Sequence, residues 1–282
     1  MSVAVVTDST ACLPAELRDR YDITVVPIPV TVNGVTGEEG IDFTPADMAT
    51  AFAARRVEVS TSRPAPETLA NVYQDLLDSG HTGVLSVHLS SKLSGTVDSA
   101  TQAAAAIGDR VHVVDSLDAG MGLGFCALAA ATEATKGRSL SHAATVATQT
   151  KHRTHTYFYV DTLEFLRRGG RISAASALVG TALAVKPILN IDDGKVIVRD
   201  KVRTSARALA RLRELITRSA GEGSIDIALH HFDSPEQTDE LGAWAREAFG
   251  RRLKRLFVTE VGAVVAAHCG PGLLGAVVHR RL

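Results

Sequence analysis

Three short runs, far apart in the chain, place small hydroxyl donors, glycine and histidine in a pattern that suits an anionic ligand. The runs are residues 61–64 (TSRP), 90–96 (SSKLSGT) and 268–272 (HCGPG). An anionic oxygen taken out of water needs donors to replace its hydration, and serine, threonine and histidine supply them without a fixed charge. A carboxylate or a phosphate could use all three runs, so the sequence predicts a ligand with an anionic head.

Each of these signals also has an ordinary structural explanation. Ser94 precedes an expected helix, and taken alone it is better explained as a helix cap. His268 alone is more often a packed histidine, although the glycines after it indicate backbone held close to another group. Asp8 and Asp115 end strands where α/β proteins place functional groups, but capping and loop locking explain them at least as well. Only the joint pattern favours the ligand.

The elements that must position these residues alternate between strand-like and helix-like runs. The run 90–96 lies between a strand at 83–89 and a helix at 96–107, which puts its hydroxyls at a helix entry. The segment 23–32 carries Pro27 and Pro29, so we expect it at a sheet edge or in a bend. Further strands are expected at 3–6, 111–114, 156–160, 185–191, 195–202, 225–230 and 256–261. Helices are expected from 44, 62, 141, 174, 204 and 236, an alanine-rich helix that ends at 134 is expected after the glycines 120, 122 and 124, and a basic glycine turn is expected at 167–172.

Length and composition favour two α/β domains. The chain has 282 residues, 45% of them hydrophobic but only 5% aromatic, which is typical of Val, Leu, Ile and Ala cores under helices. We place the boundary near 151–154, giving domains 1–152 and 153–282, each with a mainly parallel sheet and flanking helices. The formal net charge of -1 gives no general attraction to nucleic acid or to an anionic membrane.

Signal, membrane and metal-site patterns are missing from the sequence. No early stretch resembles a signal peptide and no apolar run reaches about 18 residues, so we expect a cytoplasmic chain without stable membrane insertion. The three cysteines Cys12, Cys126 and Cys269 are widely spaced, which fits reduced thiols better than disulfides or a metal site. We therefore expect no metal ion and no cofactor.

Seven motifs along the chain resemble those of the DegV family of bacterial fatty acid-binding proteins, in order and spacing. The resemblance spans nearly the whole chain and implies a two-domain α/β fold that holds one long-chain fatty acid in an apolar tunnel between the domains. In some members a separate fatty acid kinase phosphorylates the carboxyl while the acid stays bound. The motifs are residues 6–10 (VTDST), 61–64, 90–96, 114–116 (VDS), 168–172 (RGGRI), 186–188 (KPI) and the histidine-glycine run 268–272.

The resemblance also implies site residues. The carboxyl-binding hydroxyls of the family fall on Thr61 and Ser94, and its histidine falls on His268. The basic residues at the tunnel mouth correspond less securely to Arg171 and Arg203, which would suit a phosphate or a contact with the kinase. Cys269, inside the histidine motif, has no role that we can assign. Neighbours that could contribute to ligand binding are Ser62, Gly95 and Thr96.

Two enzyme classes remain as alternatives. A serine-dependent lipid hydrolase using Ser94 and His268 would want a Gly-x-Ser-x-Gly elbow, whereas the chain has Lys92-Leu93-Ser94-Gly95-Thr96. A phosphotransferase acting alone would want a phosphate loop or metal carboxylates, and neither pattern is present. We therefore expect a binding protein, with any catalysis supplied by a partner kinase.

Overall fold

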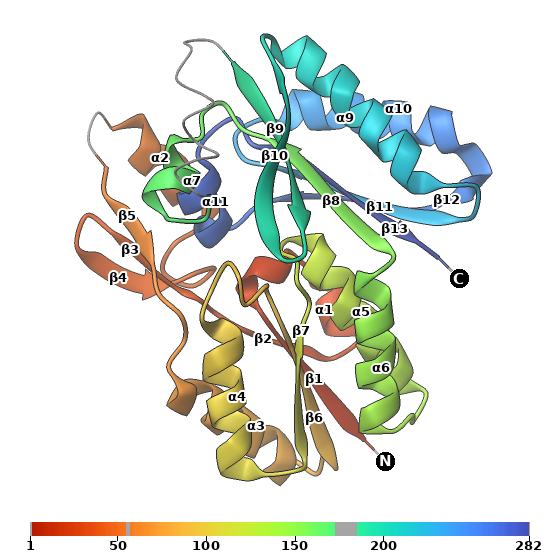
Figure 1. The fold of residues 1–282 in the computed structure, drawn as a ribbon. Helices are drawn as coiled ribbons and strands as arrows, with labels where there is room; N and C mark the ends of the chain where they lie inside the picture. The colour runs from red at the N-terminus through yellow and green to blue at the C-terminus, as the bar shows by residue number, and fades with distance from the viewer. Residues whose placement is uncertain (1, 55–56, 173–184, 282) are drawn as a thin grey trace. The chain divides into compact units, whose positions relative to one another are not determined.

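The chain divides into two compact units. The computed structural model describes residues 2–54, 57–172 and 185–281 (Figure 1). One unit contains Met1–Pro29 and Thr61–His152, and the other contains Val30–Ser60 and Arg153–Leu282. Residues 30–60 thus belong to the second unit, where a contiguous boundary at 152/153 would leave them in the first. The helix expected at 174–184 lies outside the described residues.

The first unit is built on a four-stranded parallel sheet in the order β2-β1-β6-β7. Apolar runs form the two central strands, β1 (Val3–Asp8) and β6 (Gly83–His88), which are buried along their whole length. The edge strand β2 (Ile23–Val26) ends before Pro27, as the prolines predict. The remaining elements are β7 (Val111–Asp115), η1 (Ser9–Ala11), α1 (Ala15–Arg20), α3 (Pro66–Asp78), α4 (Thr96–Ile107), α5 (Met121–Thr135) and α6 (Leu140–Lys151).

Helices cover both faces of this sheet. Helices α3 and α4 pack against each other, α5 and α6 form a second pair, and the two pairs lie on opposite faces (Figure 1). Side chains alternate along a strand, so Ala4, Val6 and Val84 all point to the α3 and α4 side. The polar residues Asp8 and Ser86 continue the same alternation.

Residues 30–60 contribute a small sheet and a helix. Strands β3 (Pro29–Val32), β4 (Val35–Glu38) and β5 (Val59–Thr61) form a three-stranded sheet in the order β4-β3-β5. Helix α2 (Pro45–Ala53) begins with a capping box, in which the Thr44 and Asp47 side chains each accept from the other residue's backbone N–H. The proline at the first turn predicts this start correctly.

The second unit contains a six-stranded sheet in the order β10-β9-β8-β13-β11-β12. Our expectation of a mainly parallel sheet is wrong here, because among the described strands only β11 and β12 pair in parallel. The Asp193-Gly194 turn forces β9 and β10 into an antiparallel hairpin, and the last strand, β13, inserts antiparallel between β8 and β11. The strands are β8 (Thr154–Tyr159), β9 (Lys186–Asp192), β10 (Lys195–Val202), β11 (Ile225–His231), β12 (Leu253–Glu260) and β13 (Leu274–Arg280).

Two long helices, α9 (Ser205–Ala220) and α10 (Pro235–Phe249), lie across one face of this sheet (Figure 1). They bury an aliphatic core that includes Leu212 and Leu241. Short elements complete the unit, namely α7 (Glu164–Arg168), η3 (Gly250–Arg252) and α11 (Ala263–Cys269). The expected basic turn at 167–172 is only partly correct, because Arg167 and Arg168 end α7 and the turn begins at Gly169. Among the described residues, no helix has the length and apolarity that crossing a bilayer requires.

Candidate functional site

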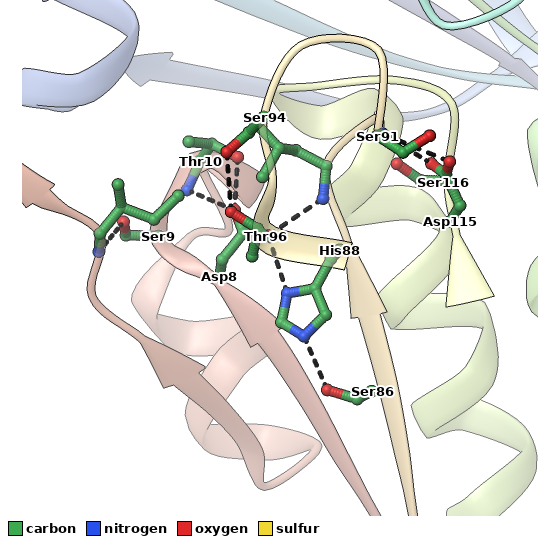
Figure 2. Close-up of polar contacts among 12 residues, drawn as sticks. Asp8, Ser9, Thr10, Ser86, His88, Ser91, Ser94, Thr96, Asp115 and Ser116 are labelled. Carbon is green, nitrogen blue, oxygen red and sulfur yellow. Dashed lines mark hydrogen bonds and ion pairs between the residues drawn. The ribbon is translucent and has the colours of Figure 1, made fainter. Parts of the chain in front are cut away.

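The loop between β6 and α4 carries the clearest group of donors. The Oγ of Ser94 lies 2.9 Å from the Oγ1 of Thr96 (Figure 2). The N-cap of α4 is Gly95, which has no side chain, so the hydroxyl of Ser94 pairs with Thr96 rather than acting as that cap. Thr96 is buried and Ser94 is half-buried. The capping explanation for Ser94 is therefore wrong, and the two hydroxyls form a polar pair at the helix entry.

Arg63 brings the 61–64 run beside this loop. A side chain added at Gly95 would meet the Cδ of Arg63 at 2.8 Å and its Nη1 at 3.1 Å, so the glycine leaves room for this arginine. The guanidinium also lies 4.0 Å from the carboxylate of Asp98, in an exposed pair. Arg63 stands inside the quoted motif but was not among the expected site residues. It is a fixed positive charge that sequence reasoning missed, beside the expected donors.

The other expected residues of this run lie at the end of β5. Thr61 is the last residue of the strand and is half-buried, while Ser62 is exposed. The backbone N–H of Ser62 donates to the carbonyl of Pro29 at 3.1 Å, which fixes where the strand ends. The run thus has one partly sheltered hydroxyl, that of Thr61, and one that faces solvent.

A buried polar chain lies under the Ser90–Thr96 loop. The Nδ1 of His88 lies 2.9 Å from the Oδ2 of Asp8, and its Nε2 lies 2.7 Å from the Oγ of Ser86 (Figure 2). The Oγ of Ser86 lies 2.7 Å from the hydroxyl of Tyr73 on α3. All four side chains are fully buried. Sequence reasoning missed His88, Ser86 and Tyr73; the available signal was two polar residues at alternate positions of an otherwise apolar strand.

In the second unit, His268 lies close to Arg171. Burial, and to a lesser extent the positive charge of Arg171, lower the pKa of His268 from 6.5 to about 4. The imidazole is therefore neutral at physiological pH and can donate one hydrogen bond and accept another. A side chain at Gly169 would meet the Nδ1 of His268 at 2.2 Å, so this glycine makes room for the ring. Burial also lowers the pKa of Arg171, whose guanidinium donates to the carbonyl of Gly169.

Two further residues of this unit, Arg203 and Cys269, are placed differently. Arg203 follows the end of β10 and is exposed. Cys269 ends α11 and is buried, and burial raises the pKa of its thiol to about 12. This cysteine therefore stays protonated and packs as a small apolar side chain.

The expected site residues thus fall into two groups, each described within its own unit. The first unit holds Thr61 and Ser62 together with the Ser94, Gly95 and Thr96 loop, and Arg63 joins the two runs. The second unit holds His268 with Arg171, and Arg203 at the end of a strand. Neutral hydroxyls, a neutral imidazole and fixed guanidinium charges are a donor set for an anionic oxygen.

The fold and the sequence are those of a known class of α/β protein. The sequence model of the family described as "Uncharacterised protein, DegV family" matches residues 2–281. A DegV domain-containing protein of Streptomyces coelicolor is 48% identical over 279 residues, covering 99% of each chain. The chain therefore belongs to the DegV family, as its motifs predict.

Solved structures agree with this assignment. A DegV family protein from Thermus thermophilus, described by its fatty acid binding, is 34% identical, covers 100% of both chains and superposes with a TM-score of 0.93. DegV from Bacillus subtilis, described as a fatty acid binding protein, is 31% identical with a TM-score of 0.90 over 100% of both chains. The α/β fold class expected from the sequence is confirmed by these matches.

Proposed function

We propose that this protein binds one long-chain fatty acid, with the carboxyl held by the hydroxyls of Thr61, Ser94 and Thr96 and by His268. The observation that carries the proposal is the Ser94 and Thr96 hydroxyl pair, which serves no helix cap and stands beside the guanidinium of Arg63. Ser62 and Gly95 flank these donors. The descriptions of the Thermus thermophilus and Bacillus subtilis proteins as fatty acid binding support the same ligand.

The energetics of a lipid ligand fit a site made mainly of neutral donors. Burying about 14 methylenes at about 0.8 kcal/mol each contributes roughly 11 kcal/mol before the costs of immobilising ligand and protein. The binding site then needs only to replace the hydration that the carboxylate head group loses. Hydroxyls and a neutral imidazole provide that replacement and orient the two carboxyl oxygens.

The protein presents the bound carboxyl to a separate fatty acid kinase, which forms the acyl phosphate. No phosphate-binding loop occurs in the sequence, so the phosphoryl donor would come with the partner. Arg171 and Arg203 are the cations that would stabilise the new phosphate charge or the contact with the kinase. The protein acts as a carrier and needs no cofactor of its own.

Native mass spectrometry before and after delipidation tests the first part of this proposal. The purified protein is expected to lose one fatty acid mass on delipidation and to regain it when oleate is added. A protein that carries no lipid and takes up no added fatty acid would overturn it. A heat-denatured sample measures nonspecific uptake.

The partner step is tested by adding a fatty acid kinase and ATP to the loaded protein. Acyl phosphate is expected only with both proteins present, and Arg171→Ala or Arg203→Ala should slow its formation more than it weakens fatty acid binding. Esterase or ATPase activity of the isolated chain that disappears in Ser94→Ala would instead favour the hydrolase alternative with Ser94 and His268.

A further inference from the structure

The carboxylate of Asp8 holds together the chain segments that lead into the donor loop. Its Oδ1 accepts from the backbone N–H of Thr10 at 3.1 Å and from the hydroxyl of the same residue at 2.5 Å. Its Oδ2 lies 2.9 Å from the Nδ1 of His88 and accepts from the backbone N–H of Leu89 at 3.0 Å. Four donors thus converge on two oxygens, which a carboxylate can accept because it is an acceptor only.

The donors on Oδ2 come from the two residues that directly precede the loop. His88 ends β6, Leu89 follows it, and Ser90 begins the run that leads to Ser94. Asp8 is the last residue of β1, the strand that pairs with β6. The carboxylate therefore fixes the position at which the chain leaves the sheet. Two of its donors, on His88 and Leu89, lie within ten residues of Ser94, and the other two belong to Thr10, two residues after Asp8.

The rest of the polar chain fixes the orientation of the imidazole. Because the carboxylate of Asp8 only accepts, the Nδ1 of His88 donates to it, and the Nε2 pairs with the hydroxyl of Ser86. That hydroxyl also pairs with the hydroxyl of Tyr73. Both nitrogens of the ring thus have a partner. The histidine can therefore hold one orientation, with its donor aimed at Asp8.

Asp8, His88 and Ser86 have the residue types and order of contacts of a hydrolytic triad, but they cannot act as one. Each side chain is 0% exposed, and the Oγ of Ser86 already contacts Tyr73. A nucleophile needs access to its substrate, which this serine does not have. Because the network is buried, its role is structural.

We propose that Asp8 and His88 are positioning residues that set the Ser90–Thr96 loop so that the hydroxyls of Ser94 and Thr96 meet the carboxyl of the bound ligand. This inference rests on the proposed function and adds two residues to it that do not touch the ligand. Hydrogen bonds weaken steeply when the donor moves off line, so a small shift of the loop removes affinity for the head group. The apolar tail of the ligand is indifferent to such a shift.

This difference between the head group and the tail provides a test of the positioning role, and a general loss of stability would not reproduce its expected result. The delipidated protein is titrated with oleate and with oleyl alcohol, which share a tail and differ in the head group. In Asp8→Asn the amide offers one acceptor oxygen to four donors, and the affinity for oleate is expected to fall about tenfold while that for oleyl alcohol stays within about twofold. The double variant Asp8→Asn with Ser94→Ala is expected to lose little more than either single variant.

A second pair of variants isolates the histidine. The amide nitrogen of His88→Asn takes nearly the position of Nδ1 and keeps a donor toward Asp8, whereas His88→Leu has similar volume and no donor. We expect His88→Asn to bind oleate like the parent and His88→Leu to show the selective loss. Asp226→Asn is the control, because it alters a buried carboxylate paired with Arg281 in the other unit. It should leave the preference for oleate over the alcohol unchanged.

The outcomes distinguish a failure of the proposed function from a failure of the positioning role. If the parent binds neither ligand, the proposed function fails. If the parent prefers oleate and Ser94→Ala removes the preference, but Asp8→Asn and His88→Leu bind both ligands like the parent, the function stands and the positioning role is wrong. Equal losses for oleate and oleyl alcohol in Asp8→Asn and His88→Leu also contradict it, since they would reflect stability alone.

Discussion

The carboxylate of Glu39 accepts a hydrogen bond from the backbone N–H of Val264, at 2.8 Å, although the two residues lie 225 positions apart in the chain. Val264 stands in the first turn of α11, the helix that carries His268 near its end. A side chain at Gly262 would meet the Oε1 of Glu39 at 2.2 Å, so the glycine lets the carboxylate approach the helix start. The segment 30–60 therefore helps to fix α11, the helix that carries His268.

Replacing Glu39 should loosen α11. We expect Glu39→Ala to lower the free energy of unfolding by about 1–3 kcal/mol, because the Val264 N–H is left without this acceptor in a buried position. Glu39→Gln keeps an oxygen in place and loses only the charge at the helix start, which costs about 0.3–1 kcal/mol. Urea unfolding measures both, and hydrogen exchange at the α11 amides should quicken more in the alanine variant. Equal exchange in both variants would contradict this role.

Gly169 and Gly170 offer a matched pair for testing the place of His268. Gly169→Ala puts a Cβ 2.2 Å from the Nδ1 of His268 and must displace the ring, whereas Gly170 has open space but a φ of 71°. We expect only Gly169→Ala to raise the pKa of His268 from about 4 toward 6.5, since the displaced ring regains water. Gly170→Ala should cost about 1–2 kcal/mol of stability through backbone strain. Histidine NMR titrations distinguish the two.

Acid should destabilise the protein through buried histidines. Burial lowers the pKa of His230 from 6.5 to about 4, while its Nδ1 lies 2.8 Å from the Oγ1 of Thr259. The unfolded chain binds this proton below pH 6.5 and the folded chain only near pH 4. This contribution to stability is therefore complete above pH 6.5 and is lost as the pH falls toward 4, at about 1.4 kcal/mol per pH unit.

The variant His230→Asn keeps a polar partner for Thr259 and no longer titrates. Its free energy of unfolding should fall less steeply than that of the parent between pH 6.5 and 4. Urea denaturation at several pH values gives both slopes. Parallel curves of unfolding free energy against pH would show that His230 is not the group that binds this proton.

The head-group donors should matter for carboxylates in particular. Ser94→Ala and Thr61→Ala are each expected to weaken oleate binding by about 1–3 kcal/mol, because each removes a donor from a buried charge. Calorimetric titration of the delipidated variants measures the loss, and unchanged thermal unfolding shows that the fold is intact. If both variants bind oleate like the parent, the assignment of these hydroxyls is wrong.

Local signals predicted the elements around the loop well. The apolar run after Gly83 and the alanines after Thr96 specify a strand and a helix without help from distant residues, and both are confirmed. The donors of the loop followed from the same local pattern. Residue type and spacing were enough because β6, the loop and α4 are consecutive in the chain.

Long-range pairings were not predictable in the same way. The placement of β13 between β8 and β11 depends on partners far away in the sequence, and an apolar run alone does not say whether its neighbours run parallel or antiparallel. The pairing of Asp8 with His88 has the same origin, since it joins residues 80 positions apart. Arg63 was visible in its motif, but only the fold shows that it packs over Gly95.

The assignment of residues 30–60 to the second unit means that the chain passes between the units three times, at 29/30, 60/61 and 152/153. A protease cut at 152/153 would therefore yield two fragments that both contribute to the second unit. The N-terminal fragment would still carry Phe52, whose ring contacts Phe165 and Phe232 of the other fragment. The nicked protein should elute as one species, and the two halves expressed apart should each be incomplete until they are mixed.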